Sequence, residues 1–298
     1  MPGLPMLPTF YGENAFWFKF SRYETFKSGN EIYIIPAQGA ERTIYNPCNV
    51  GDRLITDYLE YGKLIFEGLE NNLKMNGALS LVRKYGLLGF LTFVQYSRFR
   101  VHSKEKRRIF LRDDNGEYTK EKILPEYISE YFPLLNRQSP SLDRHNEDEH
   151  LQYDNNYSEC VSWIAKKACD LYTNFKNIED FKRIKEIENL PDNEYIRKIF
   201  DCRFKIRNID LYVHFDEIRK AYLNWKADSL LEMIDILYAL KLIDEKNGLA
   251  ECKNQNCKKP FLKHRKNMKY CSDNCGNSYR VVKCINGKKI KLNTEGGK

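Results

Sequence analysis

The amino-acid sequence lacks a long hydrophobic segment and a secretory signal. Its longest apolar stretch, Leu87 to Val94, is far shorter than the roughly 20 apolar residues that a membrane-spanning helix needs. The N-terminal sequence MPGLPMLPTF carries three prolines and no charged start ahead of an apolar run, unlike a signal peptide. We therefore expect a soluble cytoplasmic protein with no membrane partner.

The sequence also lacks the patterns that mark common catalytic sites. It has no recognisable glycine-rich phosphate loop, Ser-His-Asp arrangement or open metal site, and it contains no internal repeat or low-complexity tract. An enzymatic activity is therefore less well supported than a binding function.

The overall composition is typical of a folded protein. The 298 residues are 42% hydrophobic and 13% aromatic, enough for a substantial core in one large or two smaller domains. The residue patterns predict helices within 52–98 with a break at Gly86, over 157–176, and over 228–242 with Asp228 as its cap. They predict strands at 31–36 and 209–215 and a hairpin turn at 113–116. A polar loop is predicted at 136–156. We expect an α+β fold with a mixed, mainly helical N-terminal domain over residues 1–247 and a small C-terminal domain over residues 248–298.

Four of the nine cysteines form two closely spaced pairs near the C-terminus. Cys252 and Cys257 form a Cys-x4-Cys pair, thirteen residues follow, and Cys271 and Cys275 form a Cys-x3-Cys pair. Because two such pairs bring four soft ligands together with a single loop closure, the spacing predicts a zinc site. Four thiolates leave no open coordination position, so one structural zinc ion is expected.

Other candidate ligands fit the pattern less well. His264 is an alternative ligand, but it lies among lysines, and we interpret it as a solvated or phosphate-facing side chain. The other five cysteines show no ligand spacing and are expected to be free thiols in an intracellular protein: Cys48, Cys160, Cys169, Cys202 and Cys284.

The residues around the cysteine pairs predict a local fold. Lys258–Tyr270 is long enough for a β-hairpin, and Ser272 can cap a helix that continues through Val281. Cys271 and Cys275 would then face one side of the first helical turn, where the helix dipole favours thiolates. A loop-borne pair followed by a pair at a helix start is the layout of a treble-clef-like finger.

Positive charge is concentrated in the same segment. Residues 251–298 contain 13 Lys and Arg but 3 Asp and Glu, a balance of +10, whereas the whole chain carries +8. This asymmetry predicts a polyanionic partner, and the excess of lysine over arginine favours contacts with a phosphate backbone over contacts with bases. The predicted nucleic-acid-binding residues are Lys258, Lys259, Lys263, Arg265, Lys266, Lys269, Arg280 and Lys283, with Tyr270 and Tyr279 available to stack on bases.

The finger segment resembles a known family. Cys-x4-Cys-x3-Phe followed by Lys-Tyr-Cys-Ser-x2-Cys-Gly-Asn is similar to the CGNR-type zinc finger, found at the C-terminus of bacterial proteins described as transcription regulators. The resemblance is confined mainly to residues 248–283, although the preceding helix and Lys84-Tyr-Gly-Leu-Leu-Gly are also similar to segments of such proteins. It implies a treble-clef-like finger, bound zinc, and DNA or RNA binding in transcription regulation.

One position departs from the family motif. Ser278 stands where the motif has arginine, and Arg280 follows two positions later. If the family arginine contacts phosphate, that contact moves to Arg280 or Lys283 in this chain.

Two alternatives to nucleic-acid binding stay open. The finger could serve protein contacts or the fold itself, since lysines also offset the formal −2 charge of a four-thiolate zinc site. Arg144 and His150 match the Arg-x5-His spacing of helical ribonucleases in toxin and defence systems, a resemblance that implies phosphate orientation by Arg144 and acid–base chemistry by His150. That pair lies in the predicted polar loop, where such a spacing arises easily by chance.

A further acid–base set and the role of the large domain rest on weaker patterns. His214 and Asp210 would face the same side of their predicted strand, and Asp216 follows it closely. The mainly helical domain is expected to bind a signal, a partner or a second copy of itself.

Overall fold

The computed structural model describes residues 15–91, 109–112, 118–122, 131, 157–188, 204, 206, 210–215, 221–227 and 229–282. Helices and small antiparallel sheets are combined within them, in agreement with the predicted α+β class. The helices are η1 (Pro47–Val50), α1 (Gly51–Phe66), α2 (Asn71–Tyr85), α7 (Val161–Glu188), α9 (Leu230–Ile243) and a further helix over residues 273–282. The strands are β1 (Trp17–Phe20), β2 (Tyr23–Ser28), β3 (Glu31–Pro36), β4 (Arg42–Tyr45), β5 (Ile109–Arg112), β6 (Tyr118–Lys122), β7 (Glu159–Cys160), β8 (Asp210–Phe215), β9 (Ala221–Lys226), β10 (Leu249–Glu251) and β11 (Pro260–Leu262).

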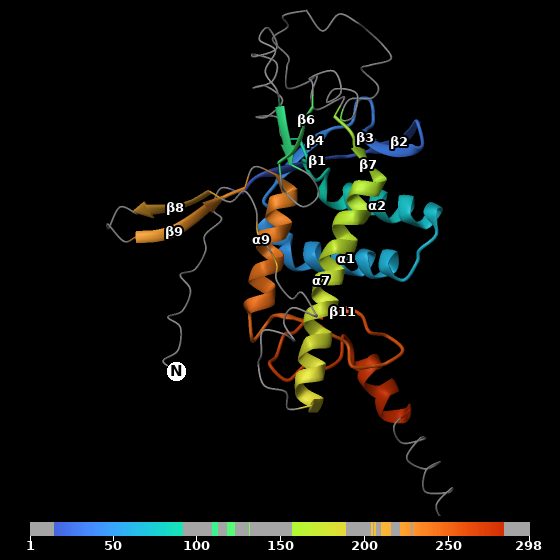
Figure 1. Ribbon diagram of the computed structural model, residues 1–298, viewed down its shortest axis with the longest axis vertical. Helices are drawn as coiled ribbons and strands as arrows, with labels where there is room; N and C mark the ends of the chain where they lie inside the picture. Colours follow the sequence, from blue (N-terminus) through green and yellow to red (C-terminus); the bar gives the residue numbers. More distant parts are fainter. Residues whose placement is uncertain are drawn as a thin grey trace, which may run out of the picture.

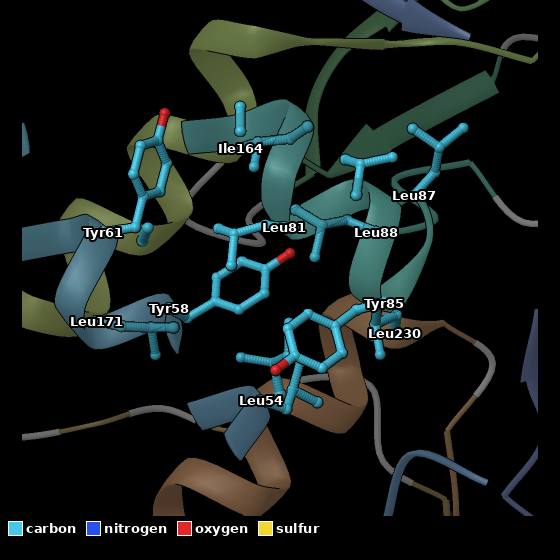
Figure 2. Packing of buried hydrophobic residues seen from close by; sticks show 14 of the residues in the cluster. Leu54, Tyr58, Tyr61, Leu81, Tyr85, Leu87, Leu88, Ile164, Leu171 and Leu230 are labelled. Atoms are coloured by element: carbon cyan, nitrogen blue, oxygen red, sulfur yellow. The ribbon is translucent and has the colours of Figure 1, made fainter. Parts of the chain in front are cut away.

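The core forms where α1 packs against α7, with α2 and α9 beside them (Figure 1). Gly62 permits the close approach of α1 to α7, because a Cβ atom there would lie 2.0 Å from the carbonyl oxygen of Ala168. Leu54 and Tyr58 of α1 are fully buried among side chains from α2, α7 and α9 (Figure 2). Leu64, farther along the same helix, is 48% exposed.

The predicted helical block within 52–98 is two helices, α1 and α2, joined by a short connection. The predicted break at Gly86 is present: its φ is +88°, which ends α2 after Tyr85. A Cβ atom at Gly86 would also lie 2.3 Å from the carbonyl oxygen of Phe18, so β1 passes close to this helix end. None of the helices in the described ranges is long and apolar enough to cross a membrane.

The strands within the described ranges form five small sheets. β2, β3 and β7 form a three-stranded sheet, whereas β1–β4, β5–β6, β8–β9 and β10–β11 are antiparallel pairs. The predicted strands at 31–36 and 209–215 correspond to β3 and β8, and β5 and β6 flank the predicted turn at 113–116. The predicted loop at 136–156 lies outside the described residues.

The start of α7 differs from the sequence prediction. The helix begins at Val161, not at Tyr157, because Glu159 and Cys160 pair with β3 as strand β7. Its end at Glu188 lies beyond the predicted end at residue 176. The expected helical position of Cys160 was therefore wrong, although its side chain is buried as expected.

Glu159 ties β7 to the segment that follows α2. Its fully buried carboxylate accepts hydrogen bonds from the backbone N–H groups of Leu88 (2.7 Å) and Gly89 (2.6 Å), and from the Tyr157 hydroxyl (2.6 Å). Burial raises the pKa of this carboxyl group, and the hydrogen bonds oppose that shift. A titratable group thus serves as the acceptor for the buried backbone N–H groups of Leu88 and Gly89.

Three parts of the chain meet beside this carboxylate. The Tyr157 hydroxyl accepts a hydrogen bond from the backbone N–H of Leu91 (3.2 Å), and the Tyr157 ring stacks on that of Tyr131 with centroids 6.3 Å apart. The backbone N–H of Ser158 donates to the carbonyl oxygen of Tyr131 (3.1 Å). Leu91, Tyr131 and Tyr157 therefore lie together at one point of the core.

Helix α9 leads into the cysteine segment, as the sequence predicts. Its cap is Ser229, whose hydroxyl accepts a hydrogen bond from the backbone N–H of Glu232 (3.2 Å), so the prediction of Asp228 as the cap was wrong. Ser229 immediately precedes the first helical residue, so its hydroxyl lies closer to that N–H group than the side chain of a residue one position earlier would.

Candidate metal centre

The four cysteines of the two predicted pairs come together in space. Each of Cys252, Cys257, Cys271 and Cys275 offers a sulfur atom, and all four sulfurs lie within 4.8 Å of one another. The Sγ–Sγ distances are 3.6 Å between Cys257 and Cys271 and 3.5 Å between Cys271 and Cys275. A tetrahedral site with metal–sulfur bonds of about 2.3 Å has edges of about 3.8 Å, whereas a disulfide bond measures about 2.05 Å. The cluster therefore fits a four-coordinate metal ion such as zinc.

The first pair lies between two short strands. Leu249 in β10 pairs with Leu262 in β11, and the backbone N–H of Cys252 donates to the carbonyl oxygen of Lys259 (3.0 Å). The prediction of a hairpin over Lys258–Tyr270 was therefore wrong, because β11 pairs with a strand that precedes the first cysteine. Lys263–Tyr270 forms an irregular connection to the second pair.

The turn of the first pair contains a strained residue. Lys258 has φ +45°, a left-handed conformation that side chains other than glycine and asparagine seldom adopt. The backbone N–H groups of Cys257 and Lys258 both donate to the carbonyl oxygen of Asn254, at 2.9 and 3.0 Å. This tight turn directs the chain from Cys257 back towards β11.

The second pair lies at the start of the helix over residues 273–282. The Ser272 hydroxyl accepts a hydrogen bond from the backbone N–H of Cys275 (3.3 Å), and the Ser272 carbonyl oxygen accepts one from Gly276 N–H (3.1 Å). The predicted cap at Ser272 is thus present, and it fixes the first turn that carries Cys275.

Asn254 connects the two cysteine pairs and was missed by the sequence analysis. Its buried side-chain amide donates to the carbonyl oxygen of Cys275 (3.2 Å), while its side-chain oxygen accepts from the backbone N–H of Asn256 (3.1 Å). Asn254, Gln255 and Asn256 are three consecutive residues with amide side chains, and the local sequence does not distinguish them. Only the folded turn identifies which of them is buried, so no local signal could have found it.

The thiol pKa values show what a metal ion must do at this site. Burial raises the pKa of Cys257 and Cys271, whereas the hydrogen bond from Ser272 lowers that of Cys275. Four thiolates at these distances would repel one another strongly without a cation. A metal ion that binds here therefore displaces protons from at least the thiols of Cys257 and Cys271.

The cysteine segment contacts α1 through polar groups. The ammonium group of Lys63 donates to the carbonyl oxygen of Cys257 (2.6 Å), and Lys259 forms an ion pair with Glu60 (2.7 Å). This ion pair raises the pKa of Lys259. The N-terminal part of the chain thus supplies contacts to the cluster that the finger sequence alone does not contain.

The segment also packs against α7 and the main core. The nearly buried carboxylate of Glu251 pairs with both Lys176 and Arg183 of α7, each at 3.1 Å. Leu249 and Leu262 belong to the same hydrophobic cluster as the residues of α1, α7 and α9. The predicted boundary at residues 247 and 248 thus separates segments that share one core.

The predicted nucleic-acid-binding residues fall into two groups. Lys259 is paired with Glu60, and Lys263 is half-buried and donates to the carbonyl oxygen of Glu245 (3.2 Å). The others within the described residues are exposed: Lys258, Arg265, Lys266, Lys269 and Arg280. Lys283 lies outside the described residues.

The aromatic and histidine candidates lie near the exposed cations. Tyr270 and Tyr279 are half-buried and pack on each other, with ring centroids 5.5 Å apart and planes tilted by 41°. His264 is exposed and does not belong to the four-sulfur cluster. Both tyrosines therefore keep part of their surface available to a partner.

The alternative site residues are only partly covered by the structure. Arg144, His150, Asp216, Cys202 and Cys284 lie outside the described residues. Asp210 and His214 occupy same-face positions of β8, where their cross-strand partners are Lys226 and Tyr222. Cys48, Cys160 and Cys169 do not join the metal cluster.

Comparison with known proteins gave no matching family model, no matching curated protein and no matching solved structure. The likeness to CGNR-type fingers therefore rests on the quoted residues alone.

Proposed function

We propose that this protein binds zinc through Cys252, Cys257, Cys271 and Cys275, and that the finger so formed binds the phosphate backbone of DNA or RNA. The observation that carries the proposal is the set of five exposed cations around the cysteine cluster, on a segment that docks to α7 through Glu251 and to α1 through Lys259. Transcription regulation is the role that the CGNR-type resemblance suggests for such a finger.

The donor set supports zinc as the bound metal. Four thiolates in tetrahedral arrangement suit zinc or iron, and zinc is the metal that the CGNR-type resemblance implies. All four positions are protein ligands, so the ion stabilises the fold and does not activate water. Metal analysis of the purified protein, with one zinc per chain expected, tests this assignment.

Charge compensation does not account for the exposed cations. A loaded four-thiolate site carries a formal charge of −2, and the ammonium groups of Lys63 and Lys259 already lie beside the first pair. Lys258, Arg265, Lys266 and Lys269 make no side-chain hydrogen bond or ion pair within the described part of the chain. These side chains are therefore accessible to an anionic partner.

Fluorescence anisotropy with labelled duplex DNA, single-stranded DNA and RNA tests the proposal. Five cations on five phosphates predict a slope of log K against log salt of about −4.5 for a duplex and about −3.5 for a single strand. The variant Cys271→Ser should lose zinc and most of this affinity. Binding that stays unchanged after zinc loss would refute the finger as the binding surface.

A purely structural finger is the second candidate, favoured by the contacts of Glu251 and Lys63 that join the finger to α7 and α1. It predicts no binding to any of the three polymers at low salt, together with a large loss of stability when the metal is removed.

A further inference from the structure

A cleft separates the C-terminal half of α7 from the first cysteine pair. Its volume is about 270 Å³, and α7 forms one wall while the turn after β10 forms the other. In Figure 1 the cysteine segment lies beside this end of α7. The lining residues are Glu179, Lys182 and Arg183 on α7, and Glu251, Cys252, Lys253, Gln255 and Lys258 on the cysteine segment.

Cations outnumber anions in this lining. Its two carboxylates are already paired within the protein: Glu179 with Lys182 at 2.7 Å, and Glu251 with Arg183 at 3.1 Å. Asp180, outside the lining, holds the Arg183 guanidinium from a second side at 2.8 Å. The lining as a whole therefore carries more positive than negative charge, with Lys182 and Arg183 on one wall, where both are paired with carboxylates, and Lys253 and Lys258 on the other.

The size and chemistry of the cleft suit a phosphate group. Pockets that enclose a whole small molecule measure about 300–1,000 Å³, and this cleft lies just below that range. No aromatic side chain lines it, so it offers no platform for a base. Two opposed cationic walls match the backbone of one strand, whereas a duplex carries its phosphates on a convex outer surface and would reach only the rim.

We propose, on the basis of the nucleic-acid binding proposed above, that a single strand runs into this cleft from the loop that carries the exposed Arg265, Lys266 and Lys269. There a phosphodiester group lies between Lys258 of the finger and Lys182 and Arg183 of α7. The helical body thereby contributes directly to the interface, at residues that belong to no finger motif.

The test is anisotropy with a fluorescein-labelled single strand of 20 thymidines, comparing Lys182→Ala with Lys166→Ala. Both lysines are on α7, are about half exposed (52% and 46%), and pair with a neighbouring carboxylate of the same helix. Lys166 is at the far end of α7 and is the matched control. Loss of one phosphate contact lowers the salt slope by about 0.7, which at 0.1 M salt is about a five-fold loss of affinity.

The expected result is this loss for Lys182→Ala, no change for Lys166→Ala, and recovery in Lys182→Arg, which keeps the charge. Equal affinities of Lys182→Ala and Lys166→Ala would overturn the proposal, as would failure of Lys182→Arg to recover or tighter binding of duplex than of the single strand. If Lys266→Ala weakens binding while Lys182→Ala does not, the finger interface stands and the cleft is excluded. If the wild-type protein does not bind the strand at all, the proposed function itself fails.

Discussion

Removal of the metal should destabilise the helical body as well as the finger. Replacing Cys271 and Cys275 together by serine leaves two thiols, too few to hold the two pairs together. If the cysteine segment then leaves α1 and α7, Leu249 and Leu262 are withdrawn from the shared core. Each buried leucine contributes about 1.5–3 kcal/mol, so the body loses roughly 3–6 kcal/mol.

This loss is large relative to the stability of a typical domain, about 5–15 kcal/mol. For a body of this size, 1 kcal/mol corresponds to about 2–4 °C in melting temperature, so the double variant should melt roughly 6–24 °C below the wild type. Hydrogen exchange should accelerate in α1 and α7, the helices that contact the segment.

Calorimetry on zinc-loaded protein, with zinc content measured on the same samples, gives the comparison. The matched control replaces Cys48 and Cys169 by serine, because both are half-buried cysteines outside the cluster. The reasoning is refuted if the zinc-free variant melts within about 2 °C of the control, since finger and body would then be energetically independent.

Three further predictions concern the cysteine segment. Burial raises the pKa of Cys257 and Cys271, so a metal ion must displace their protons when it binds. The affinity for the metal should therefore fall as pH decreases from 8 to 6, by up to about 100-fold per pH unit. A metal affinity that is independent of pH in chelator competition would contradict this. Lys258→Gly removes a side chain from a residue in left-handed backbone conformation, so the free energy of unfolding measured by urea titration should rise by up to about 1 kcal/mol. The same variant should bind nucleic acid more weakly. A loss of stability would show that the Lys258 side chain has another structural role. Asn254→Ala should lower the free energy of unfolding by about 1–2 kcal/mol and the zinc affinity by about ten-fold. The exposed control Asn256→Ala should change neither quantity. Equal effects of the two substitutions would argue against a role of Asn254 in linking the cysteine pairs.

Local patterns in the sequence predicted the parts of this molecule that depend on local chemistry. The spacing of the four cysteines, the serine cap at Ser272 and the apolar periodicity of α9 each involve residues close in the chain. Such features need little information from the rest of the fold.

Features that depend on distant partners could not be predicted. Strand β7 has only two residues and is defined by pairing with β3, far earlier in the chain, so periodicity favoured a helix there instead. The partner of β11 precedes the first cysteine, which explains the misplaced hairpin. The pairing of Lys259 with Glu60 is likewise non-local, and charge counting alone assigned that lysine to a partner molecule.

The meeting of Leu91, Tyr131 and Tyr157 beside the Glu159 carboxylate has a consequence for how this protein can change in length. The chain between Leu91 and Tyr131 and the chain between Tyr131 and Tyr157 therefore each have both ends at this point of the core. Each doubling of the length of a chain segment whose two ends are held together costs only about 0.6 kcal/mol in chain entropy. A change in the length of either stretch should therefore cost little in closure entropy, whereas inserting or deleting one residue between Tyr157 and Glu159 would misplace the carboxylate and disrupt the junction.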